Sequence, residues 1–223
     1  MHRAKQILMI VNLLDKQMKS FFSFLCVALF AFGAHADEVA PDVLIRTVTD
    51  DVLTIVRTDK DLKSGNTAKA VDLVEAKVLP NFNFTRMTQL AMGRDWRQAS
   101  AAQQKALTDE FRSLLVRTYS KALTEYKNQT VTMKPFSLKA GETDAKVRTE
   151  IRQSGSKPIE LDYYLEKGNP GWKVYDIEVG GISLVTNYRD TFASEVRNGG
   201  IDGLIKTLQS KNHSGDASTA AKK

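Results

Sequence analysis

The chain has 223 residues, of which 42% are hydrophobic and 26% are charged, and its formal net charge is +6. This length suits one domain or two small ones with a real core, and the composition excludes a wholly disordered chain. Only one cysteine and three histidines are present, which leaves little for thiol or imidazole chemistry.

The N-terminal segment has the three parts of a cleavable secretory signal. A 13-residue apolar run, Phe21–Gly33, follows two lysines and precedes the sequence Ala34-His35-Ala36. The run is shorter than the roughly 20 residues that span a bilayer, and a basic region, a short apolar region and an A-x-A site are typical of signal peptides. We predict that residues 1–36 are a signal peptide cleaved after Ala36. Residues 1–17 are interpreted as a mis-assigned start, since Met18 opens a more compact signal.

The mature chain lacks the groups that many catalytic and metal sites need. Without residues 1–36, Cys26 is lost, His213 is the only histidine and the net charge is +3. A disulfide, a thiol nucleophile, a histidine-based triad and a zinc site of the usual kind are therefore excluded. Nucleic acid is not an expected partner, because the charge is small and Arg148 and Arg152 alternate with an acidic residue.

The first half of the mature chain has helical periodicity, in segments 42–59, 67–79, 84–93 and 100–126. Apolar residues recur there every three to four positions, which predicts four helices. Pro80 follows the second segment and Gly93 ends the third, since proline breaks a helix and glycine favours its C-terminal end. Ser100 and Gln103 form a capping-box pattern at the start of the fourth.

The second half switches to a period of two, in segments 131–138, 145–152, 159–166 and 172–179. Short turns rich in glycine and serine join them, which predicts four antiparallel strands in a meander. Pro135 marks the first as an edge strand or a bulge. Helical spacing returns at Ile182 and is broken at Asn198-Gly199-Gly200 before a last short helix. The predicted class is α+β with about six helices covering one face of a four-stranded sheet, and residues 211–223 are predicted to be a disordered tail.

Motifs for enzymatic chemistry are weak in this sequence. The phosphate-binding pattern G-x-x-x-x-G-K-[ST] is absent, so the chain has no built-in ATP motor of that kind. Ser183 stands in a G-x-S-x sequence whose next residue is Val185 where the serine-hydrolase turn needs glycine. Asp176 and Glu178 lie two apart on one strand face, a spacing that suits either acid–base work or solvated carboxylates. We expect no enzymatic activity.

Several blocks of sequence occur in a characteristic order between about Val39 and Ser210. They are AMGRDWR at 91–97, SAAQ at 100–103, FRSLL at 111–115, WKVYDI at 172–177, GGISLVTNYR at 180–189 and GIDGL at 200–204. In this order and spacing they resemble the MlaC family of periplasmic phospholipid-binding proteins, also called toluene-tolerance proteins. The most specific part is the block W-x-V-Y-D-x-x-x-x-G-x-S followed by G-I-D-G-L.

The resemblance implies both a fold and a function. The fold is a twisted four-stranded antiparallel sheet wrapped by helices, with a lipid-binding cavity between sheet and helices in a domain at 37–210. The function is to carry a diacyl phospholipid through the periplasm, between an outer-membrane lipoprotein–porin complex and an inner-membrane ABC transporter with an MCE-domain partner. This transport maintains the lipid asymmetry of the outer membrane. No cofactor or metal is expected besides the bound phospholipid, and a monomer is expected.

On this interpretation, apolar residues of the strands and helices line the cavity, although the same spacing also fits a plain core. The predicted lining residues are Leu90, Phe111, Leu115, Tyr119, Val147, Ile151, Leu161, Tyr163, Val174, Tyr175, Ile182, Val185 and Tyr188. Arg94 and Arg97 follow a helix end and are predicted to contact the headgroup or a partner, since arginine suits both.

Three alternatives use the same apolar surfaces. A periplasmic chaperone or adaptor would hold an apolar client. An enzyme for a small apolar substrate would need an acid–base pair such as Asp176 with a tyrosine. A lipoprotein carrier would leave most of its client outside the pocket.

Overall fold

The computed structural model describes residues 39–126 and 128–214, and its α+β class is the one that the periodicity predicts. The predicted signal peptide, with its cleavage site, lies outside the described residues, and so do residues 215–223 of the predicted tail.

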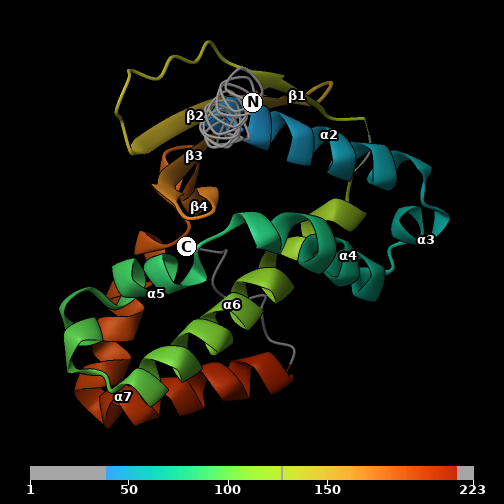
Figure 1. Cartoon of the computed structure of the whole chain (residues 1–223). Helices are drawn as coiled ribbons and strands as arrows, with labels where there is room; N and C mark the ends of the chain where they lie inside the picture. The colour runs from blue at the N-terminus through green and yellow to red at the C-terminus, as the bar shows by residue number, and fades with distance from the viewer. Residues whose placement is uncertain (1–38, 127, 215–223) are drawn as a thin grey trace, which may run out of the picture. The chain divides into compact units, whose positions relative to one another are not determined.

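Helices make up the first half of the described chain (Figure 1). They are α2 (Pro41–Thr58), α3 (Lys60–Lys63), α4 (Thr67–Leu73), α5 (Phe84–Met92) and α6 (Ala101–Thr124), with the short turns η1 (Val74–Val78), η2 (Leu79–Asn81) and η3 (Gly93–Gln98). Pro41 occupies the first turn of α2, where its missing N–H costs nothing. The predicted capping box is confirmed, because Ser100 and Gln103 bond each other's backbone N–H groups.

The sheet has five antiparallel strands in sequence order, where the sequence predicts four. They are β1 (Thr130–Met133), β2 (Asp144–Arg152), β3 (Ile159–Gly168), β4 (Gly171–Val179) and β5 (Ile182–Ser183). β5 pairs with the end of β4, and the prediction that helical structure begins at Ile182 is wrong. Because β5 has only two residues, its sequence cannot show the alternation of apolar and polar residues that marks a strand. β1 ends before Pro135, which has no N–H to donate to a ladder.

The pairing of β3 with β4 contains a β-bulge that changes which residues share a face. Tyr163 pairs with Ile177, but beyond the register shift Leu165 pairs with Val174. The chain of β4 therefore presents Val174 and Ile177, three positions apart, to the same side. Tyr175 lies on the opposite face, where its ring contacts that of Tyr164 at 6.4 Å.

The last part of the chain consists of η4 (Thr186–Tyr188) and α7 (Arg189–Ser214). The predicted break is confirmed, because Gly200 interrupts α7 with φ 69° and ψ −176°, a conformation that favours glycine. Helix α7 extends to Ser214 and so includes the first four residues of the predicted tail. α7 packs along α6 (Figure 1). No helix in the described residues is long and apolar enough to cross a membrane.

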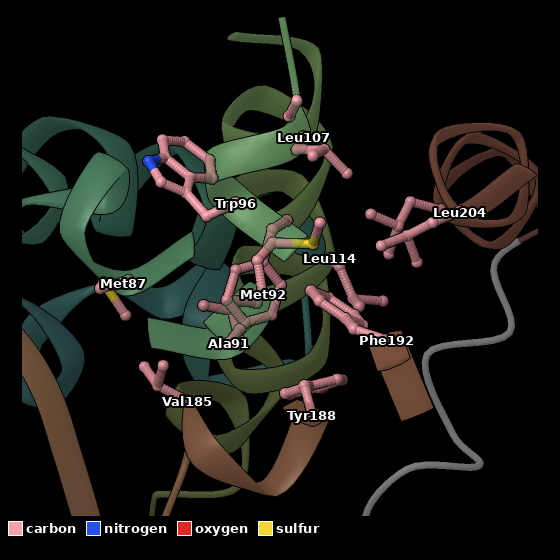
Figure 2. Close-up of a cluster of buried hydrophobic side chains, with 14 residues drawn as sticks. Met87, Ala91, Met92, Trp96, Leu107, Leu114, Val185, Tyr188, Phe192 and Leu204 are labelled. Carbon is pink, nitrogen blue, oxygen red and sulfur yellow. The ribbon is translucent and has the colours of Figure 1, made fainter. Parts of the chain in front are cut away.

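The buried apolar side chains form three separate clusters. The helical cluster joins α5, η3, α6, η4 and α7, and its side chains converge between these helices in Figure 2. The sheet cluster contains Ile45 of α2 with Val147, Leu165 and Val174. The α2 cluster joins α2, α3 and α4 and includes Val52. Since the sheet cluster and the α2 cluster are distinct, one continuous core does not fill the space between the sheet and α2.

Candidate ligand-binding cavity

A cavity of about 820 Å³ lies between α2 and the sheet. Ligand pockets typically have ~300–1,000 Å³, so this one can take a large molecule. The cavity is open to solvent, so in the working protein it holds either solvent or a bound molecule with apolar surface.

Two apolar walls face each other across the cavity. Helix α2 contributes a stripe at helical spacing, made of Ile45, Val48, Thr49, Val52, Leu53 and Val56. The sheet contributes Val131, Ile151, Ile159, Leu161, Tyr163, Val174 and Ile177. Val78, Phe82 and Leu123 close the space between the two walls. Such a lining removes apolar surface from water and suits hydrocarbon chains.

Tyr163 and Thr49 place two hydroxyl groups within the apolar lining. Tyr163 comes from β3 and Thr49 from α2, and the two side chains lie near each other. Burial raises the pKa of Tyr163 to about 12, and the nearby Thr49 hydroxyl opposes only part of this effect. The phenol therefore stays protonated at physiological pH and can donate to an acceptor oxygen.

One end of the cavity is polar. Arg57 of α2 donates to the Tyr126 hydroxyl at 2.8 Å, and that hydroxyl donates to the carbonyl of Gln129 at 3.0 Å. The Gln129 amide then donates to the Gln153 side chain at 3.2 Å. This chain of hydrogen bonds ties α2 to the sheet beside the exposed Lys157 of the β2–β3 turn. Apart from the hydroxyls of Tyr163 and Thr49, an amphiphile bound in the cavity thus meets mainly apolar side chains, with polar groups at this end.

The structure places four of the predicted lining residues in this cavity: Ile151, Leu161, Tyr163 and Val174. All four come from the central strands of the sheet. Val147 lies on the same face of β2, but it is fully buried in the sheet cluster and does not line the cavity.

The predicted helical residues lie together in a different place. Phe111, Leu115, Val185 and Tyr188 are buried in the helical cluster, with Leu90 and Tyr119 packed against it. Phe111 makes edge-to-face ring contacts at 5.1 Å with both Tyr188 and Phe192. These residues hold α6 and α7 together, and none of them lines the cavity.

The remaining predicted residues are exposed or face away from the cavity. The β-bulge turns Tyr175 to the outer face, where Arg86 lies 4.8 Å from its ring. Ile182 is 61% exposed in β5. Arg94 and Arg97 are exposed in η3, beside the helical cluster. The structure therefore does not bring these four together with the cavity lining.

The wall that sequence reasoning missed is the apolar stripe of α2. Val48, Val52 and Val56 recur at helical spacing, and all three line the cavity. That signal is present in the sequence, but it is the same signal that predicts burial in a core. Nothing in the spacing says whether the facing surface is filled by side chains or left open.

Asp176 has a structural task outside the cavity. Its carboxylate accepts hydrogen bonds from the N–H of Ile177 at 2.8 Å, the Ser183 hydroxyl at 2.5 Å and the N–H of Val185 at 3.2 Å. Burial raises the pKa of Asp176, and the three hydrogen bonds oppose this effect. Asp176 thus anchors the turn from β4 into η4. Within the described residues, no group of His, Cys, Asp and Glu is arranged to hold a metal ion.

Comparison with known proteins supports a single family. The model of the MlaC protein family matches residues 46–210. The intermembrane phospholipid transport system binding protein MlaC of Haemophilus influenzae is 26% identical, over 86% of this chain and 93% of that protein. The toluene tolerance protein ttg2D of Pseudomonas putida is also 26% identical, over 82% of this chain and 84% of the other.

A solved structure is similar as well. It is the phospholipid-binding protein from Ralstonia solanacearum, determined in complex with a phospholipid. It is 43% identical to this chain and superposes with a TM-score of 0.72, covering 78% of this chain and 97% of the other.

Proposed function

The chain belongs to the MlaC family, and from that premise we propose that it is a periplasmic carrier of diacyl glycerophospholipid. The acyl chains lie in the cavity between α2 and the sheet. The carrier exchanges its lipid with an outer-membrane lipoprotein–porin complex and with an inner-membrane ABC transporter that has an MCE-domain partner. Its task is to maintain the lipid asymmetry of the outer membrane.

The observation that carries this proposal is the apolar cavity of about 820 Å³, in a chain similar to a protein solved with a phospholipid. The walls are mostly apolar and a polar group of residues lies at one end, which matches an amphiphile with two hydrocarbon chains. A protein client with many backbone amides would leave those amides without partners against such walls.

The energetics explain why such a protein exchanges its cargo with membranes. Two acyl chains have roughly 30 methylenes, and their removal from water is worth about 25 kcal/mol at about 0.8 kcal/mol each. This exceeds the practical limit of net affinity, about 18–21 kcal/mol. The relevant comparison is therefore between the free energy of the lipid in the cavity and its free energy in the bilayer. A carrier can load and unload lipid when these two free energies are close. The direction of transport is then set by the energy-consuming transporter.

The test is uptake of lipid from a membrane. The protein is purified without detergent from cells that express the full chain, mixed with an excess of vesicles of isotopically labelled phospholipid, and separated from them by flotation. We expect the recovered protein to contain up to about one labelled diacyl lipid per chain. Recovery without labelled lipid, together with suppression of aggregation of an unfolded client, would contradict a carrier and favour a chaperone.

A further inference from the structure

A second, smaller pocket of about 270 Å³ lies beside the cavity. Arg46, Thr49 and Asp50 of α2 line it on one side, and residues 131–133 of β1 line it on the other. Thr49 and Val131 also line the large cavity. The two pockets are therefore neighbours that share part of their lining.

The smaller pocket contains one positive and one negative group without partners. Arg46 and Asp50 lie one helical turn apart on α2. Neither side chain makes a hydrogen bond or an ion pair with any residue in 39–126 or 128–214. The neighbouring Asp51, by contrast, pairs with Lys77 at 3.3 Å. An ion pair between two exposed groups at this spacing contributes little free energy. Charged groups of a ligand can therefore compete for both side chains.

The polarity changes in steps from the cavity to this pocket. The aliphatic walls come first, followed by the hydroxyls of Tyr163 and Thr49, and then by the charges of Arg46 and Asp50. A glycerophospholipid has the same order of groups: acyl chains, ester carbonyls, a phosphodiester and its substituent. The Tyr163 phenol and the Thr49 hydroxyl are both able to donate to ester carbonyls.

We infer that the smaller pocket is the headgroup site, where Arg46 binds the phosphodiester and Asp50 binds a primary amine attached to it. The inference rests on the proposed function and adds the class of headgroup that this chain prefers. A guanidinium presents paired donors that match phosphate oxygens. A carboxylate in the same pocket repels a headgroup that has only negative charge and attracts a zwitterion with an ammonium group.

Lys157 at the polar end of the cavity is the rival site for the phosphate. It is a single ammonium on an exposed turn, and Glu125 lines the same end of the cavity. The arginine pocket has the better match, since it offers two donors for the phosphate and a partner for the amine. The test therefore compares the two positions directly.

The experiment measures which lipid the protein selects from mixed vesicles. Protein from cells expressing the full chain is loaded from vesicles with equal amounts of phosphatidylethanolamine, phosphatidylglycerol and diacylglycerol of the same acyl chains. Mass spectrometry then quantifies the bound lipids. Arg46→Gln should lower the ratio of phospholipid to diacylglycerol about threefold to tenfold. Asp50→Asn should lower the ratio of the ethanolamine lipid to the glycerol lipid about threefold.

The matched control is Arg197→Gln, an exposed arginine in α7 that lines neither pocket, which should leave both ratios unchanged. Lys157→Gln should have a smaller effect than Arg46→Gln. The inference is overturned if Arg46→Gln leaves the ratios unchanged, or if Lys157→Gln lowers them as much, while total lipid stays near one per chain. If wild-type protein takes up no lipid at all, the proposed function itself fails.

Discussion

Replacing Leu161 by tryptophan is expected to lower the affinity for phospholipid at least tenfold while the protein stays folded. Leu161 is half-buried on the central strand β3 and faces the cavity. Because open space lies in front of this side chain, an indole fits there without the strain of overpacking a filled core. Displacing even two methylenes of an acyl chain costs about 1.6 kcal/mol, and about 1.4 kcal/mol is already a tenfold loss of affinity.

The matched control for Leu161→Trp is Ile182→Trp. Ile182 is an aliphatic residue of the same sheet, but it is 61% exposed and does not line the cavity. It should keep its full load of lipid, measured by extraction and mass spectrometry, with circular dichroism as the check of folding. If Ile182→Trp loses the lipid and Leu161→Trp keeps it, the cavity between α2 and the sheet is not the binding site.

The second large effect is expected on stability. Phe111 is fully buried, and its ring contacts Tyr188 and Phe192 at 5.1 Å in the helical cluster. Phe111→Ala leaves a void between α6 and α7, and such a substitution costs about 3–5 kcal/mol of unfolding free energy. Urea denaturation followed by circular dichroism measures this loss as a lower midpoint.

Phe111→Ala also tests whether Phe111 only supports the fold or contacts the bound lipid as well. Phe111 does not line the cavity, so the fraction of Phe111→Ala that is folded should still contain about one lipid per chain. A small effect on the denaturation midpoint together with a large loss of lipid would mean that Phe111 contacts the ligand. The helical cluster would then have to open toward the lipid, contrary to its close packing.

Strands and helices with an unbroken period could be predicted from the sequence, and irregular ones could not. The alternation in β2 and β3 matches their pairing throughout, from Ala145 with Leu165 to Ile151 with Ile159. In β4 the bulge shifts the phase, so alternation alone cannot place Val174 and Ile177 on one face. The two residues of β5 pair through the backbone, and that pairing leaves no pattern in the side chains.

The cavity was harder to predict than the fold for a physical reason. The apolar stripes of α2 and α6 have the same period, since each must face away from water. The stripe of α6 meets α7 in a filled cluster, while the stripe of α2 faces open space. The two stripes differ in how far each helix lies from the element that it faces, and this distance depends on the whole fold. The sheet residues Leu161 and Tyr163 could be predicted because apolar residues occupy every second position of β3 in the sequence.

The most direct test of the account is native mass spectrometry of the protein purified without detergent from cells that express the full chain. We expect a mass that exceeds that of the polypeptide by about one phospholipid, with diacyl species recovered on extraction. A protein with the bare polypeptide mass, folded but without lipid, would contradict the claim that this cavity holds a phospholipid in the cell.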